Sequence, residues 1–158
     1  MDNKGDRTPN RCGEIRAIIK EIDDFIVSND WYNVLRDSRK NYYWGYILHL
    51  TRLYNAGQIL IQRGGDGKIT GICSWVRCTR DSQLEINKTT FGLPKDISNG
   101  SMLHITICVI NGGSIGTFRR NFVETVGKEV EEVCWFNAPT NKFIRRKNIL
   151  KEKCYARN

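Results

Sequence analysis

The sequence predicts an α+β protein with a mixed, mostly antiparallel central sheet flanked by helices. Three patterns support this prediction: an apolar run at residues 101–110 that leads through glycines into an amphipathic helix, a helical stripe of isoleucines at residues 14–27, and a hairpin pattern at residues 58–78. No linker or repeat divides the 158 residues, and this length suits one hydrophobic core. We therefore predict a single domain over residues 1–158.

The N-terminal part of the chain is expected to be helical. Residues 1–12 are polar and are expected to be loose, as are residues 150–158 at the other end. After the helix of residues 14–27, the aromatic-rich segment 31–54 predicts one or two further helices. Their core-facing residues are expected to be Ile47, Leu48, Leu50 and Leu53. The clustered rings either pack a helix onto the sheet or form a surface on which a substrate or a nucleic-acid base stacks.

Six segments have the composition of strands. In chain order they are residues 58–63, 68–78, 84–90, 101–110, 131–137 and 142–147. The first two are joined by a tight turn at Asp66-Gly67. The last is basic and is expected at the edge of the sheet, where charges are tolerated.

The segment that joins the apolar run to its helix has the composition of an anion-binding loop. Residues 111–117 read NGGSIGT, and helical periodicity follows from Phe118. Glycines let the backbone approach a phosphate closely, and the free N–H groups and dipole of a helix N-terminus attract it. Ser114 or Thr117 is expected to cap the helix or to donate a hydroxyl to the same anion. A surface turn that binds nothing has the same composition.

Two nucleotide-binding motifs do not fit this loop, because it lacks both the Lys-Ser/Thr pair of a P-loop and the G-x-G-x-x-G spacing of dinucleotide binders. The loop resembles instead the acyl-CoA pyrophosphate loop of the GNAT superfamily of N-acyltransferases. The matching positions are Gly112, Ile115, Gly116 and Thr117, and the departures are Asn111 and Ser114. With the predicted order of elements, the resemblance covers residues 14–147.

The resemblance implies an acyl-CoA cofactor, acetyl-CoA or another acyl-CoA, and no metal. The loop would hold its diphosphate, and the preceding strand would pair with its pantetheine arm. The residues implied in cofactor binding are Val109, Ile110, Asn111, Gly112, Gly113, Ser114, Ile115, Gly116 and Thr117. The implied reaction is acyl transfer to an amine of a protein, a small molecule or a modified base.

Two branches of the superfamily look most similar. Small GNAT-like proteins of phages and bacteria have an end that resembles residues 133–147, and toxin-activating lysine acyltransferases share a pattern like residues 72–75. The second branch uses a His near the first loop and an Asp on the strand before the glycine loop. This chain has no His in residues 28–37, and the Asp position falls near the apolar Ile107. Those two catalytic residues therefore do not transfer.

Three other residues are candidates for acid–base chemistry in such a transfer. They are His104 on the central strand, Glu85 on the weak strand of residues 84–90, and Tyr155 near the C-terminus. Each has a structural alternative: a hydrogen-bonded core histidine, a solvent-facing strand residue and a residue of a loose tail.

Charge and composition limit the kinds of partner and cofactor that the sequence predicts. Residues 140–158 hold seven Lys or Arg against one Glu, which is +6 of the net charge of +8. This basic end favours a polyanion, which is nucleic acid, an acidic partner or the phosphates of a cofactor, although a solvated end has the same composition. The six cysteines are expected to be free thiols in the core, and the two histidines and absent C-x-x-C argue against zinc. No apolar run suits a membrane span or a signal peptide, so the expected location is the cytoplasm of a bacterial or phage-infected cell.

The sequence thus predicts an acyl-CoA-dependent N-acyltransferase. The alternative is a catalytically inactive GNAT-like accessory protein of phage origin, which binds a protein or nucleic-acid partner through basic residues 142–157. A subunit or regulator of a larger assembly is a third interpretation.

Overall fold

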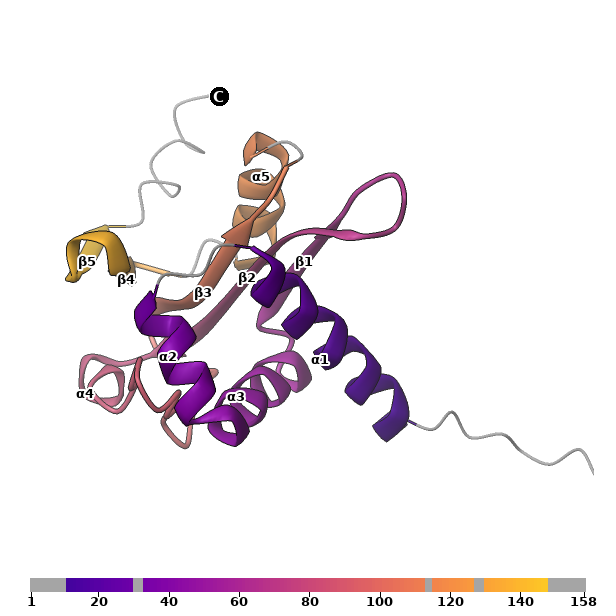
Figure 1. Cartoon of the computed structure of the whole chain (residues 1–158). Helices are drawn as coiled ribbons and strands as arrows, with labels where there is room; N and C mark the ends of the chain where they lie inside the picture. Colours follow the sequence, from indigo (N-terminus) through magenta and orange to yellow (C-terminus); the bar gives the residue numbers. More distant parts are fainter. Residues whose placement is uncertain (1–10, 30–32, 113–114, 127–129, 148–158) are drawn as a thin grey trace, which may run out of the picture.

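The computed structural model describes residues 11–29, 33–112, 115–126 and 130–147, and Figure 1 shows their arrangement. The helices are α1 (Arg11–Ser28), α2 (Asn33–Asn41), α3 (Tyr43–Asn55), α4 (Arg80–Gln83), α5 (Ile115–Val126) and the 3-10 turn η1 (Ala138–Thr140). The strands are β1 (Ile59–Arg63), β2 (Ile69–Cys78), β3 (Met102–Ile110), β4 (Glu132–Asn137) and β5 (Lys142–Lys147).

The described strands form one five-stranded sheet in the order β1-β2-β3-β4-β5. The pairs β1–β2, β2–β3 and β4–β5 are antiparallel, and β3–β4 is parallel. Parallel neighbours cannot be joined by a tight turn, so the chain crosses over between them, and α5 lies in that connection. The predicted α+β class with a mixed, mostly antiparallel sheet is confirmed.

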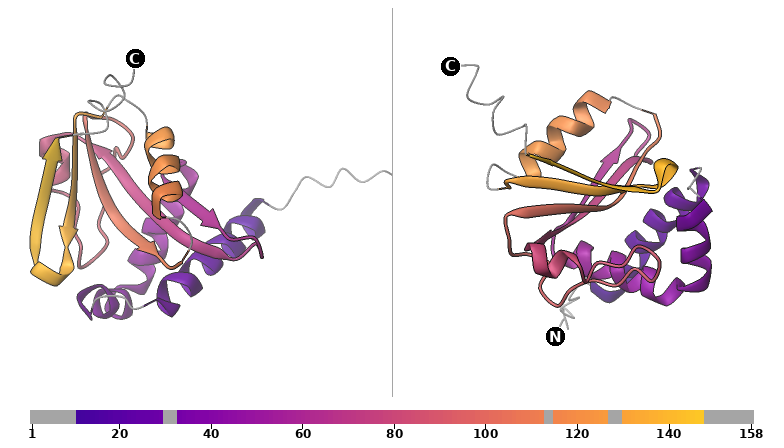
Figure 2. Two further views of the ribbon diagram at one scale, coloured as in Figure 1. Left: turned by 90° about the horizontal axis from the view of Figure 1, so that it is seen from above. Right: turned by 90° about the vertical axis from the view of Figure 1, so that its left-hand side faces the viewer.

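Helices cover both faces of the sheet. Figure 2 shows α5 on one face and the α1–α3 group on the other. On the α1–α3 face, Ile22, Leu50 and Ile72 are completely buried in the largest core cluster. On the opposite face, the Phe118 ring of α5 lies against Gly71, where a Cβ would be only 3.0 Å from two ring carbons. The absence of a side chain at Gly71 therefore lets α5 pack closely on β2.

An ion pair ties α2 to α1. Arg39 donates from Nε and Nη2 to the two carboxylate oxygens of Asp23 at 2.9 and 2.7 Å. Asp23 is buried, and the Arg39 guanidinium also lies over the rings of Tyr43 and Tyr46. A bidentate pair of this kind fixes both distance and orientation, so it sets how the two helices lie together.

A β-bulge interrupts the pairing of β2 with β3. Ser74 is opposite Ile107, whereas the next residue, Trp75, is opposite Ile105, so Thr106 is an extra residue of β3. The bulge also changes the face of the sheet to which alternate side chains of β3 point. Ile105 packs with the cluster beneath α5, whereas Ile107 belongs to the cluster beneath α1 and α3. A bulge bends its strand and increases the local twist.

The predicted strands are confirmed except one. The expected strand of residues 84–90 is wrong: Thr79 and Ser82 form a capping box for the short helix α4, and turns follow from Leu84. Residues 87 and 92 make only an isolated bridge. The segment lacks the apolar alternation that would bury one face of a strand, so local capping decides its conformation.

The helices are also confirmed, with corrections at their ends and faces. Residues 11 and 12 belong to α1 rather than to a loose end, and α5 begins at Ile115 rather than at Phe118. Leu48 is 59% exposed, because the buried stripe of α3 runs through Tyr46, His49, Leu50 and Leu53. Of the aromatic cluster, Tyr46 packs in the core, whereas Trp44 is 80% exposed.

The cysteine prediction is partly wrong. Cys73, Cys78 and Cys134 are buried free thiols as expected, but Cys12 and Cys108 are exposed. Cys154 lies outside the described residues, as do the segments 1–10 and 148–158.

Gly100 provides a test of the loop that leads into β3. Its φ is +124°, and a Cβ there would clash with the Cys78 carbonyl oxygen. We expect Gly100→Ala to lower the free energy of unfolding by about 3 kcal/mol or more, since backbone strain and a clash with main-chain atoms combine. Gly65→Ala, at a site with no atom within 4 Å of the added Cβ, should change it by less than about 0.5 kcal/mol. Urea denaturation measures both, and equal midpoints for the two variants would contradict the prediction.

Candidate functional site

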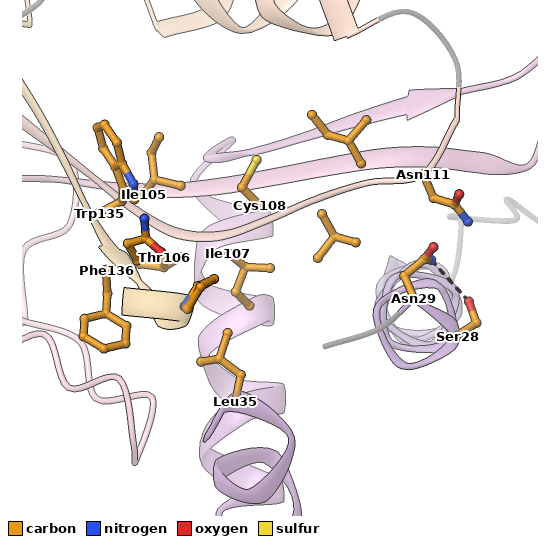
Figure 3. A pocket seen from close by; sticks show the side chains of 14 residues that line it. Ser28, Asn29, Leu35, Ile105, Thr106, Ile107, Cys108, Asn111, Trp135 and Phe136 are labelled. Atoms are coloured by element: carbon orange, nitrogen blue, oxygen red, sulfur yellow. Dashed lines mark hydrogen bonds between the residues drawn. The ribbon is translucent and has the colours of Figure 1, made fainter. Parts of the chain in front are cut away.

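The candidate site is a cleft between β3 and β4. These strands pair over four residues only, Met102–Ile105 with Glu132–Trp135. Beyond Ile105, β3 remains paired with β2 alone, and β4 remains paired with β5. The cleft that opens there has a volume of about 930 Å³ and is lined by residues 105–111 and by residues 135–137. Figure 3 shows Ser28, Asn29 and Leu35 from the helices at its margin.

The edge of β3 along the cleft offers main-chain groups. The Asn111 N–H donates to the Thr70 carbonyl of β2 at 2.8 Å. Because N–H and C=O groups alternate in direction along a strand, the main chain of Val109 also faces β2. That of Cys108 and Ile110 faces the cleft. Of the two strand residues predicted to pair with an extended ligand, the geometry favours Ile110 over Val109.

A hydrogen-bonded chain of buried side chains reaches the cleft at the bulge. The His49 ring of α3 lies 3.2 Å through Nδ1 from the Phe91 carbonyl and 3.1 Å through Nε2 from the Thr106 hydroxyl. Thr106 Oγ1 is 2.8 Å from Ser74 Oγ. A carbonyl can only accept, so Nδ1 carries the proton and Nε2 accepts from the Thr106 hydroxyl. Thr106 therefore joins a buried histidine to the cleft that it lines.

Sequence reasoning did not identify His49 or Thr106 as site residues. His49 is 3% exposed, and burial lowers its pKa to about 4, so the ring is neutral at neutral pH. The sequence feature that could have identified His49 is its spacing within α3. It lies three residues after Tyr46 and four before Leu53, which places it on the buried stripe of the helix. Nothing in the sequence indicated the bulge that brings Thr106 to it.

The glycine loop lies at the end of the cleft-forming strand. Gly112 has a φ of +77° with open space around it, so the chain turns there in a conformation that favours glycine. Gly113 and Ser114 lie outside the described residues. Ile115, Gly116 and Thr117 form the first turn of α5 and are exposed. Thr117 is therefore inside the helix and is not its cap, and the other residue expected there, Ser114, is outside the described part of the chain.

The two predicted acid–base residues that the structure describes, His104 and Glu85, do not line the cleft. His104 is buried in the part of β3 that is still paired with β4, with its ring 5.6 Å from that of Phe143. Its Nδ1 has no hydrogen-bond partner, and burial lowers its pKa to about 4. Glu85 is exposed in the turn after α4, so its expected place on a strand is wrong. Tyr155 lies outside the described residues.

The described residues lack two further kinds of site. No group of three His, Cys, Asp or Glu side chains there is placed to hold a metal ion. In the same part of the chain, every helix is too short or too polar to cross a lipid bilayer.

Comparison with known proteins gives no family for this chain: no family model matches it, and no curated protein is significantly similar to it.

The two buried histidines predict acid sensitivity of the fold. Their pKa values of about 4 lie below the ordinary 6.5, so the unfolded chain binds more protons between these values and stability falls as the pH falls through this window. We expect each to remove about 2 kcal/mol from the free energy of unfolding between pH 7 and pH 5. His104→Leu should therefore lose about 2 kcal/mol less than the wild type over this range, as measured by urea denaturation.

His49→Leu serves as the matched comparison. It should remove the same pH dependence but be less stable than the wild type at pH 7, because it removes the hydrogen bonds of the His49 ring to the Phe91 carbonyl and to the Thr106 hydroxyl. An unchanged pH dependence in both variants would contradict the prediction.

Proposed function

We propose that the protein is an acyl-CoA-dependent N-acyltransferase that acts in the cytoplasm of a bacterial or phage-infected cell. The observation that carries the proposal is the divergence of two parallel strands into a cleft, at whose end a glycine turn leads into a helix. An extended ligand with an anionic end fits this arrangement, because the strand edge and the helix N-terminus offer different groups along one line.

The pantetheine arm of acyl-CoA matches the strand edge. It is an extended chain with two secondary amides, and the main-chain groups of Cys108 and Ile110 are oriented to bond such amides as a neighbouring strand would. The diphosphate would then lie beyond Gly112 at the first turn of α5. This 12-residue helix has no acidic residue in that turn to repel an anion.

Thr106 is placed to orient the acceptor amine. In the proposed transfer, the amine nitrogen would attack the thioester carbonyl carbon as the C–S bond breaks, the nitrogen would lose a proton to solvent, and the leaving thiolate would gain one from solvent. The Thr106 hydroxyl donates its proton to His49, so its oxygen can accept a hydrogen bond from the amine N–H. Neutral His49 fixes that orientation, which makes it a positioning residue rather than the base.

Binding of acetyl-CoA tests the proposal. We expect isothermal titration calorimetry to give a dissociation constant of about 1–100 μM for the wild type. Gly116→Glu should weaken binding at least about tenfold, because it adds a side chain and a like charge beside the diphosphate. The substitution itself suits the N-terminus of a helix, so folding should survive.

The control for this test is Leu84→Glu, which adds the same charge at an exposed position that does not line the cleft. It should bind acetyl-CoA like the wild type. If the wild type gives neither heat nor a thermal shift at saturating acetyl-CoA, the transferase proposal is wrong.

As a second function, we propose that the basic edge of the sheet binds nucleic acid. In the order of the described strands β5 is terminal, and Lys142, Arg145, Arg146 and Lys147 are all exposed on it. Phe143 is 43% exposed beside them and offers a ring for stacking. This function requires no catalysis and is compatible with an accessory role.

Salt dependence tests the second function. We expect a fluorescent single-stranded oligonucleotide to bind with an affinity that falls steeply with salt, by a slope of about −0.7 per phosphate contacted. Arg146→Gln with Lys147→Gln should flatten this slope. Arg16→Gln with Lys40→Gln removes two exposed charges from the helical face and should leave it unchanged. Equal slopes for the two double variants would contradict binding through β5.

A further inference from the structure

Two cysteines lie directly opposite each other in the sheet beside the cleft. Cys73 of β2 and Cys108 of β3 are register partners, so their side chains project from the same face. Because the Asn111 N–H faces β2, the alternation along β3 makes Cys73–Cys108 a non-hydrogen-bonded pair. Cα atoms in such a pair are about 4.5 Å apart, which is within the range of about 4.4–6.8 Å that a disulfide spans.

The two thiols differ in exposure. Cys108 is exposed and lines the cleft, whereas Cys73 is buried beneath it. The neighbouring Cys73 side chain lowers the pKa of Cys108, and the neighbouring Cys108 side chain together with burial raises the pKa of Cys73. Burial instead raises the pKa of Cys78 to about 11 and that of Cys134 to about 12. Accessibility and thiolate character therefore coincide at Cys108.

We propose that Cys108 is a site of oxidation by hydrogen peroxide and that Cys73 is its resolving cysteine. In the first step the Cys108 thiolate attacks a peroxide oxygen, the O–O bond breaks, and a sulfenic acid and hydroxide form. In the second step the Cys73 sulfur attacks the Cys108 sulfur, water leaves with the Cys73 proton, and a disulfide forms. The peroxide is reduced to water by the two electrons that the two thiols lose, and a dithiol reductant reverses the change.

The pairing favours the disulfide over further oxidation. A sulfenic acid in a cleft is open to a second peroxide, but here a thiol already stands opposite it on the neighbouring strand. Neither sulfur has to leave the sheet, so the oxidised protein keeps the fold. The proposal does not depend on which ligand occupies the cleft.

The test is peroxide treatment of the reduced full chain, followed by alkylation and peptide mass spectrometry. We expect a loss of about 2 Da and a cross-linked pair of peptides that contain Cys73 and Cys108, reversed by dithiothreitol. Cys73→Ser should stop at the sulfenic acid, which dimedone traps on Cys108. Cys108→Ser should form no disulfide at Cys73. Cys12→Ser, which removes an exposed thiol outside the pair, should behave like the wild type.

Three results would overturn the proposal. The first is that Cys73 and Cys108 stay reduced while Cys12 is oxidised. The second is a disulfide that joins Cys108 to a cysteine other than Cys73. The third is dimedone labelling of Cys108 in the wild type equal to that in Cys73→Ser. The wild-type mapping decides the first two even if a variant fails to fold, and Cys73→Ala is the replacement should Cys73→Ser not fold.

Discussion

The extra residue in β3 is the constraint on which the rest of the site depends. Thr106 has no residue of its own opposite it in β2, and the parallel pairing with β4 ends at the residue before it. A bulge bends a strand and can terminate pairing, so one insertion accounts for both the turning of β3 away from β4 and the switch of its buried face. The same residue bonds His49 across the sheet, which holds the bulge in place from the α3 side.

The cleft persists because each of its walls is already paired on the other side. β3 is hydrogen-bonded to β2 along its length, and β4 is hydrogen-bonded to β5. Beyond Ile105, β3 and β4 therefore each keep one paired edge without pairing with each other. The facing edge then bonds water or a ligand, and each exchange of water for a ligand amide contributes only about 0.5–1.5 kcal/mol. Tight binding therefore requires several such bonds in line, and in the proposed function the start of α5 would add a contact to the anionic end of the ligand.

The sequence predicted five strands and the α+β class correctly, because strand runs, turns and the helix between the third and fourth strands each carry a local pattern, whereas the strand expected at residues 84–90 was wrong. The glycine turn after Ile110 was also visible, since its composition suits little else. The polar residues of the cleft could not be predicted, because their positions depend on one register shift between β2 and β3, and the amino-acid composition gives no sign of that shift. The predicted histidine, His104, is a core residue, whereas His49 was passed over as part of an apolar helix. A polar residue on a buried helical stripe must find a partner, and that requirement was the usable signal.

The polarity of the cleft limits what can react inside it. Its described lining contains no charged side chain, only hydroxyl, amide, thiol and apolar groups. An ammonium ion finds no carboxylate there to offset the loss of its hydration, so an amine is favoured in the cleft in its neutral form. The neutral form is the one that attacks a thioester. In the proposed function, the uncharged reacting groups of an acyl-CoA would lie in the cleft and its anionic end at the start of α5, and Thr106 and Cys108 would be polar side chains close to the reacting groups.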